Sequence, residues 1–85
     1  MAAYKILIAK TAQKQLDKFP RQKADPLIKV ILNLAQNPRP AGYIKLKGRN
    51  AFRIRKGNYR IIYEIKDNTL TVIVIAIGHR RSIYR

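Results

Sequence analysis

The stretch Phe52-Arg53-Ile54-Arg55-Lys56-Gly57-Asn58-Tyr59-Arg60-Ile61-Ile62-Tyr63 decides the fold of this chain. Apolar and polar side chains alternate on both sides of Gly57-Asn58, which is the pattern of two half-buried strands. A Gly-Asn pair between two such runs is typical of a two-residue β-turn. The sequence therefore predicts an antiparallel hairpin with its turn at Gly57-Asn58.

This turn fixes which residues lie opposite each other. Arg55 pairs with Arg60, and Arg53, Arg55 and Arg60 share one face of the hairpin, since side chains alternate between faces. The other face carries the apolar side chains expected to meet the helices, Phe52, Ile54, Ile61 and Tyr63. Like charges directly opposite on a sheet are destabilising. A sequence selected only for stability would avoid this pairing, so we interpret the arginine face as functional.

The rest of the chain predicts two helices and two more strands. Residues 4–9 alternate like a strand, Thr11 is a candidate N-cap for a helix over 12–18, and a second helix is expected over 21–36. Pro26 either kinks that second helix or marks its start, with Asp25 as the N-cap. Residues 69–78 are apolar on both faces, as in an interior strand.

The predicted order is β-α-α-β-β-β within a single domain covering residues 1–85. The expected fold class is α+β, with two N-terminal helices packed on a small, largely antiparallel four-stranded sheet. If Asp67-Asn68 forms the next two-residue turn, Lys66 lies opposite Thr69 and Arg60 opposite Ile75. Arg80 would then begin about 16 Å beyond Arg60 at the usual rise of a strand.

Charge points to an anionic partner. The 85 residues include 19 Lys and Arg against 4 Asp and Glu, for a net charge of +15. Seven of the nine arginines follow Gly42, and arginine suits bidentate contacts with phosphate. The start Met1-Ala2-Ala3-Tyr4 is not followed by a long apolar run, and no apolar stretch is long enough for a membrane span. We expect a cytoplasmic protein that binds no membrane.

The available side chains restrict the chemistry. The chain has no cysteine, one histidine and four scattered acids, so we predict no metal site and no cofactor. Glycine-rich phosphate loops and nucleophile motifs are also missing. RNA brings its own nucleophile, the 2′-OH, and then needs only orientation, charge stabilisation and two proton transfers. Because arginine keeps its proton, Tyr84, His79 or a lysine must help with those transfers.

Three segments together resemble the RelE/ParE toxin superfamily, on the RelE side. They are the hairpin, the segment Lys45-Leu46-Lys47-Gly48 and the C-terminal run Ile77-Gly78-His79-Arg80-Arg81-Ser82-Ile83-Tyr84. The resemblance covers nearly the whole chain. It implies a toxin of a toxin–antitoxin module, an endoribonuclease (mRNA interferase) that cuts mRNA in the ribosomal A site by 2′-OH attack without a metal. The implied partners are the ribosome, mRNA and a cognate RelB-like antitoxin.

The resemblance also assigns roles to single residues. It implies that Arg60 stabilises the phosphate and that Arg80 acts on the leaving group. It also implies that Tyr84 positions or deprotonates the 2′-OH. Arg55 belongs to the catalytic strand, and His79 lies where certain relatives place a histidine for proton transfer. The residues expected to contact RNA are Lys45, Lys47, Arg49, Arg53 and Arg81.

Two other functions fit the same sequence. A ParE-like toxin would inhibit DNA gyrase by binding and would need no nuclease site. A basic RNA-binding module would bind without catalysis. The arginines paired across the hairpin favour the nuclease, because a gyrase-binding protein has no use for them.

Overall fold

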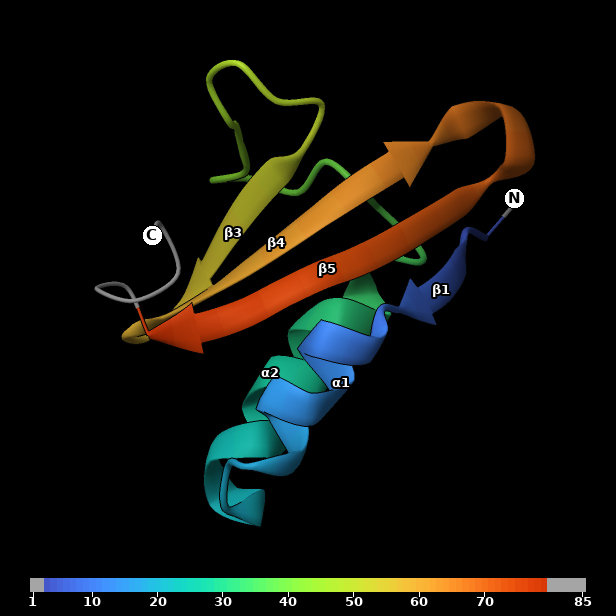
Figure 1. Cartoon of the computed structure of the whole chain (residues 1–85). Helices are drawn as coiled ribbons and strands as arrows, with labels where there is room; N and C mark the ends of the chain where they lie inside the picture. Colours follow the sequence, from blue (N-terminus) through green and yellow to red (C-terminus); the bar gives the residue numbers. More distant parts are fainter. Residues whose placement is uncertain (1–2, 80–85) are drawn as a thin grey trace.

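The computed structural model describes residues 3–79 of the 85-residue chain. Figure 1 shows two helices below a twisted sheet. The elements in chain order are β1 (Lys5–Ile8), α1 (Lys10–Asp17), α2 (Arg21–Asn33), β2 (Ile44–Lys45), β3 (Phe52–Lys56), β4 (Tyr59–Lys66), the 3₁₀ helix η1 (Asp67–Thr69) and β5 (Thr71–His79). Arg80, Arg81 and Tyr84 lie outside the described residues.

The sheet has the strand order β1-β5-β4-β3-β2. β1 runs parallel to β5, and the other neighbours are antiparallel. The predicted α+β class is therefore confirmed, as is the interior position of the 69–78 strand. The strand count differs by one because Ile44 and Lys45, which lie in none of the predicted strands, pair with Arg53 and Phe52 along the free edge of β3.

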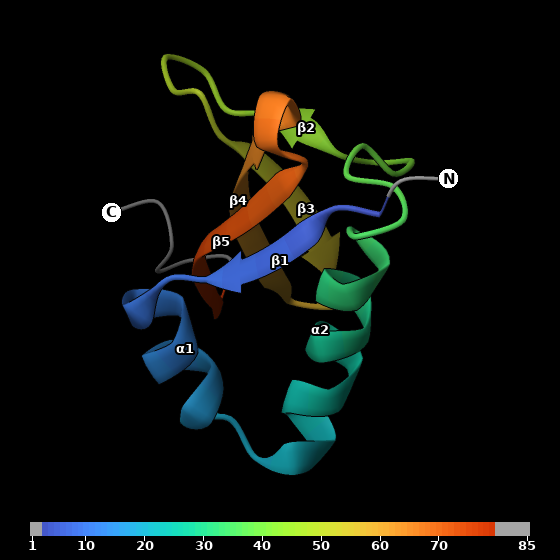
Figure 2. The same ribbon diagram turned by 90° about the vertical axis from the view of Figure 1, so that its right-hand side faces the viewer.

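Both helices cover the same face of the sheet, as the turned view in Figure 2 makes clear. The core lies between them and that face. Its fully buried members are Ala12, Leu27, Ile31, Leu34, Ile61, Tyr63, Val72, Val74 and Ile77. Phe52 and Ile54 pack against this cluster, so the predicted apolar face of the hairpin is confirmed.

The helix ends differ from the predicted ones. α1 begins at Lys10 after Ala9, and no side chain caps it, so Thr11 is not its N-cap. α2 begins at Arg21, because the N–H groups of Lys23 and Ala24 already bond to Pro20. Pro26 therefore lies inside α2, and the alternative start with Asp25 as N-cap is wrong.

The predicted register of the first hairpin is confirmed. Lys56 lies opposite Tyr59, Arg55 opposite Arg60 and Ile54 opposite Ile61. Gly57 has a φ of 61°. Left-handed backbone of this kind favours glycine, because a Cβ would approach the following carbonyl oxygen.

The predicted register of the second hairpin is wrong. The turn contains η1 followed by Leu70 with a φ of 49°, so Lys66 pairs with Thr71 instead of Thr69. A β-bulge next to Ile62 then shifts the pairing by one more residue. Arg60 consequently lies opposite Gly78, three residues further along β5 than Ile75. The end of β5 thus lies beside Arg60.

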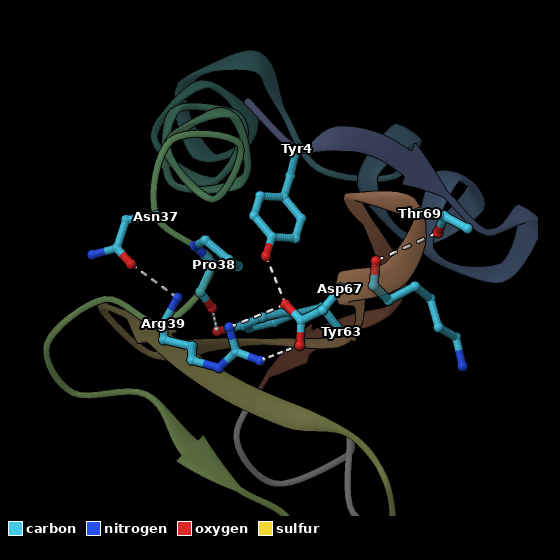
Figure 3. Close-up of polar contacts among 8 residues, drawn as sticks. Tyr4, Asn37, Pro38, Arg39, Tyr63, Asp67 and Thr69 are labelled. Carbon is cyan, nitrogen blue, oxygen red and sulfur yellow. Dashed lines mark hydrogen bonds and ion pairs between the residues drawn. The ribbon is translucent and has the colours of Figure 1, made fainter. Parts of the chain in front are cut away.

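A polar cluster secures the turn between β4 and β5 (Figure 3). Asp67 accepts hydrogen bonds from the Tyr4 hydroxyl at 2.6 Å and from Arg39 Nη2 at 2.7 Å. The Tyr63 hydroxyl donates to the Pro38 carbonyl at 2.8 Å. These bonds attach the loop after α2 to the end of the sheet remote from the first hairpin turn.

These contacts and burial shift pKa values in the cluster. The hydrogen bond from Arg39 lowers the pKa of Asp67. The hydrogen bond to Asp67 raises the pKa of Tyr4. Burial raises the pKa of Tyr63 to about 12. Each shift favours the protonation state that is present in the cluster. Acid should therefore weaken the cluster by protonating Asp67, and alkali should weaken it by ionising Tyr4 and Tyr63.

Candidate active site

The candidate site is the sheet face that carries Arg53, Arg55 and Arg60, called here the arginine face. Arg53 and Arg55 come from β3 and Arg60 from β4, and Arg55 lies directly opposite Arg60. Opposite residues on antiparallel strands have their Cα atoms only about 4.5–5.5 Å apart. Both helices lie on the other side of the sheet (Figure 1). The fold therefore holds two arginines together on a face that α1 and α2 leave uncovered.

The three arginines differ in exposure. Arg55 is exposed, whereas Arg53 and Arg60 are half-buried, with their Nε atoms shielded from solvent. Arginine commonly buries its aliphatic stem and keeps its charged end near water. A partly buried stem has fewer available rotamers, so Arg53 and Arg60 present their charge from a more fixed position than a surface arginine would.

One acidic residue shares this face of β4. Glu64 lies four residues from Arg60, with Ile62 between them on the same face. Its carboxylate forms an ion pair with the ammonium group of Lys66, with 3.4 Å between Oε1 and Nζ. Glu64 is thus held at the far end of β4, about 13 Å along the strand from Arg60.

Other predicted RNA-contacting residues lie elsewhere. Lys45 pairs with Phe52, so it occupies the opposite face of the sheet edge from the arginine face. Lys47 and Arg49 are exposed in the loop between β2 and β3. The structure therefore brings Arg53, Arg55 and Arg60 together and does not bring Lys45 to them. The roles predicted for Arg80, Arg81 and Tyr84 fall outside residues 3–79.

His79 lies on the helix side of the sheet. It pairs with Tyr59, and the two rings meet edge to face with their centroids 5.9 Å apart. The Tyr59 ring also contacts Phe19, at 5.0 Å between centroids. Because Tyr59 alternates with Arg60 along β4, His79 lies on the face opposite the arginines. The shifted register of β5 causes this placement, and no local sequence pattern indicates the bulge.

Gly78 is a site neighbour that sequence reasoning missed. It lies within β5, directly opposite Arg60. A glycine near the end of an apolar strand is a signal for close backbone approach, but its register could not be read from the sequence.

Two hollows lie on the helix side, one on each side of Tyr59. One, of about 330 Å³, has Lys18, Phe19, Tyr59, Gly78 and His79 in its walls. The other, of about 340 Å³, lies between α2 and the hairpin turn, with Lys23 and Lys56 in its walls. Basic residues therefore also line the helix side below the hairpin.

Two further observations concern the part of the chain that the structure describes. Between residues 3 and 79, no group of three or more His, Cys, Asp or Glu side chains could hold a metal ion. Neither α1 nor α2, the two α-helices of that range, has the length and apolar character needed to cross a membrane.

Comparisons with known proteins agree on a toxin family. Residues 6–84 match the family described as "ParE toxin of type II toxin-antitoxin system, parDE". Toxin RelE3 of Methanocaldococcus jannaschii is 40% identical over 94% of both chains. Toxin RelG of Mycobacterium tuberculosis is 29% identical over 96% of this chain and 97% of its own.

A solved structure has the same fold. It is the toxin–antitoxin complex RelBE2 from Mycobacterium tuberculosis, with a TM-score of 0.84 and 26% identity. The match covers 94% of each chain. This chain therefore shares its overall fold with a toxin whose structure has been solved in that complex.

Proposed function

Because the chain belongs to the RelE/ParE superfamily of toxins from type II toxin–antitoxin systems, we propose that it is a ribosome-dependent endoribonuclease. It cuts mRNA in the ribosomal A site and thereby stops translation. The observation that carries this proposal is Arg55 directly opposite Arg60 on the sheet face that the helices leave uncovered. Two adjacent guanidinium groups suit a phosphate that gains negative charge during reaction.

The reaction uses groups that RNA itself supplies. The 2′-oxygen attacks the adjacent phosphorus, the bond from phosphorus to the 5′-oxygen breaks, and the products are a 2′,3′-cyclic phosphate and a 5′-hydroxyl. Arg55 and Arg60 stabilise the extra charge on the phosphate. The proton of the 2′-OH must leave and the 5′-oxygen must gain one. The proposal needs no bound metal, since the nucleophile lies next to the phosphorus.

The two oxygens that exchange protons are assigned to residues beyond β5. Tyr84 positions or deprotonates the 2′-OH and Arg80 stabilises the leaving 5′-oxygen, as the family resemblance implies, and the 5′-oxygen takes its proton from water. His79 is left out of this assignment because its ring packs on Tyr59 at the opposite face. Lys47 and Arg49, exposed beside β3, contribute attraction to ribosomal RNA that weakens as salt is raised.

The proposed partner that controls this activity is a RelB-like antitoxin. Support comes from the similar Mycobacterium tuberculosis structure, which is a toxin–antitoxin complex. A chain with a net charge of +15 suits a partner with acidic segments. Both the ribosome and such an antitoxin place the protein in the cytoplasm.

A second candidate is inhibition of DNA gyrase by binding. The observation that favours it is the match of residues 6–84 to a family described by the name ParE. Binding alone would not require Arg55 and Arg60 to lie opposite each other, because a binding surface can spread its charges. A third possibility, binding of RNA without cleavage, uses the same arginines but leaves the message intact.

One experiment separates these functions. The purified protein is incubated with programmed ribosomes, with naked mRNA, and with gyrase plus relaxed DNA. The proposal predicts cleavage in the ribosome reaction alone. Loss of supercoiling with intact mRNA would replace it by the gyrase function, and ribosome binding without cleavage would replace it by the non-catalytic one.

A further inference from the structure

The hollow between α1 and the end of β5 has the composition of a nucleobase site. Its volume is about 330 Å³, near the lower end of the range for ligand pockets in proteins. α1 and the residues after it contribute Gln15, Lys18 and Phe19, and the strand ends contribute Tyr59, Gly78 and His79. Aromatic, amide and cationic groups thus surround a space of the size expected for a small ligand.

Three aromatic rings form one continuous wall of this hollow. Phe19 contacts Tyr59 at 5.0 Å, and Tyr59 contacts His79 at 5.9 Å with the ring planes 85° apart. Proteins hold unpaired bases mainly by stacking them on aromatic side chains of these types.

Gln15 provides polar recognition at the same place. Its Oε1 atom accepts the backbone N–H of Ile77 at 2.7 Å, across 62 positions of sequence. This bond uses the carbonyl end of the amide and fixes the side chain against β5. The two N–H donors at the other end can bond to a carbonyl or ring nitrogen of a base. Lys18 supplies positive charge at the same hollow.

The hollow is separated from the arginine face by a single strand. Gly78 forms part of the hollow and also lies directly opposite Arg60. A phosphate held by Arg60 and a base held by Tyr59 and His79 are therefore on two sides of the same strand end.

We propose that this hollow binds one base of the RNA whose phosphate lies at Arg55 and Arg60. The inference rests on the proposed nuclease function and adds a subsite to it. The second hollow, beside Lys23 and Lys56, has Tyr59 as its only aromatic ring. Stacking therefore favours the hollow at His79, which becomes a base-contacting residue rather than a proton-transfer group.

Binding can be measured by NMR on the full chain, because His79 is its single histidine and gives one imidazole signal. The probes are the four nucleoside monophosphates, with ribose 5-phosphate as the control for phosphate alone. The nucleotides are expected to shift the His79 signal and to show contacts from base protons to its ring. An unmoved His79 signal, or an equal shift with ribose 5-phosphate, would overturn the proposal.

Matched variants locate the site. Phe19→Leu removes an aromatic face but stays apolar, and it should weaken nucleotide binding by at least about fivefold. Lys23→Ala, at the second hollow, should leave the affinity within twofold. Equal binding by Phe19→Leu would overturn the proposal. If that variant does not fold, the contacts between base protons and His79 in the unchanged chain decide the question instead.

The nuclease function is tested separately. Cleavage on ribosomes should be slowed by Phe19→Leu and abolished by Arg60→Ala. If the unchanged protein leaves mRNA intact, the proposed function fails, while the NMR titration still reports on the hollow. If mRNA is cleaved but no base contacts His79, only the subsite fails.

Discussion

Arg55 on β3 and Arg60 on β4 lie directly opposite each other, on the sheet face away from both helices. Like charges directly opposite each other on a sheet are destabilising. This destabilising pair lies where a phosphate would contact both positive charges. Stability and activity should therefore respond in opposite directions to changes at this pair.

Replacing Arg55 by glutamine tests whether stability and activity change in opposite directions. Arg55→Gln keeps a long polar side chain but removes one of the paired charges, so the free energy of unfolding should rise by a few tenths of a kcal/mol. Urea unfolding at low salt measures the change, and ribosome cleavage should fall at the same time.

The matched control is Arg49→Gln, in the exposed loop before β3. It changes the net charge equally but does not relieve a cross-strand pair, so a smaller gain is expected. In 1 M salt, where charges are screened within about 3 Å, the gain from Arg55→Gln should shrink. A stability loss at low salt in Arg55→Gln would contradict the repulsion.

The hairpin turn should be sensitive to a side chain at Gly57. The cause is its φ of 61°, because no atom beyond Gly57 and its two chain neighbours lies within 4 Å of the position that a Cβ would take. Gly57→Ala should lower the free energy of unfolding by about 1–2 kcal/mol. Gly57→Asn should cost less, because asparagine tolerates left-handed backbone. Thermal unfolding of both variants shows which of them loses more stability. Equal losses would show that a steric clash of the new side chain is the cause, and not the backbone conformation.

Acid should weaken the contact between Asp67 and Arg39. The folded-state pKa of Asp67 lies below its ordinary value because of the arginine hydrogen bond. The stabilisation is therefore fully present above about pH 4, the ordinary pKa of aspartate, and it disappears as the pH falls through the lower folded-state value. The stability difference between the unchanged protein and Asp67→Asn, measured by urea unfolding, should be larger at pH 7 than at pH 2.5.

Asp17→Asn is the control for this measurement. It makes the same chemical change at a carboxylate that bonds to neutral Gln13 at 2.9 Å. That variant should keep the acid-dependent loss of the unchanged protein. An Asp67→Asn variant with the same pH profile as the unchanged protein would show that the cluster in Figure 3 adds no stability.

Alkali should act through Tyr63. Burial raises its folded-state pKa to about 12, whereas the unfolded chain ionises this residue near pH 10. The neutral form is favoured in the fold, so this stabilisation is complete below about pH 10 and is lost as the pH rises toward 12. Tyr63→Phe should flatten the pH dependence in that range. It should also cost about 1 kcal/mol at pH 7 through the lost bond to Pro38.

The first hairpin could be read from the sequence because two local signals agree. Gly57-Asn58 specifies the turn, and the alternation of apolar and basic residues over 52–55 and 59–61 specifies the faces. A slip of one residue would put Ile54 and Ile61 on the solvent side. The arginine face followed from this register without further information.

The second hairpin could not be read because its register depends on two features without a clear local signature. Leu70 adopts left-handed backbone although leucine rarely does, which lengthens the turn by two residues. The bulge beside Ile62 adds a third. Both determine where Gly78 and His79 lie, so only the three-dimensional structure separates His79 from the arginines and places it beside Tyr59.

The most direct test of the nuclease account is the chemistry of the cut ends. Programmed ribosomes are incubated with the unchanged protein, with Arg60→Ala, and with Arg21→Ala, an exposed arginine on α2 that controls for charge. The account predicts a 2′,3′-cyclic phosphate and a 5′-hydroxyl at A-site cuts made by the unchanged protein and by Arg21→Ala, and intact mRNA with Arg60→Ala. Cleavage by Arg60→Ala at the unchanged rate, or intact mRNA in all three reactions, would contradict it.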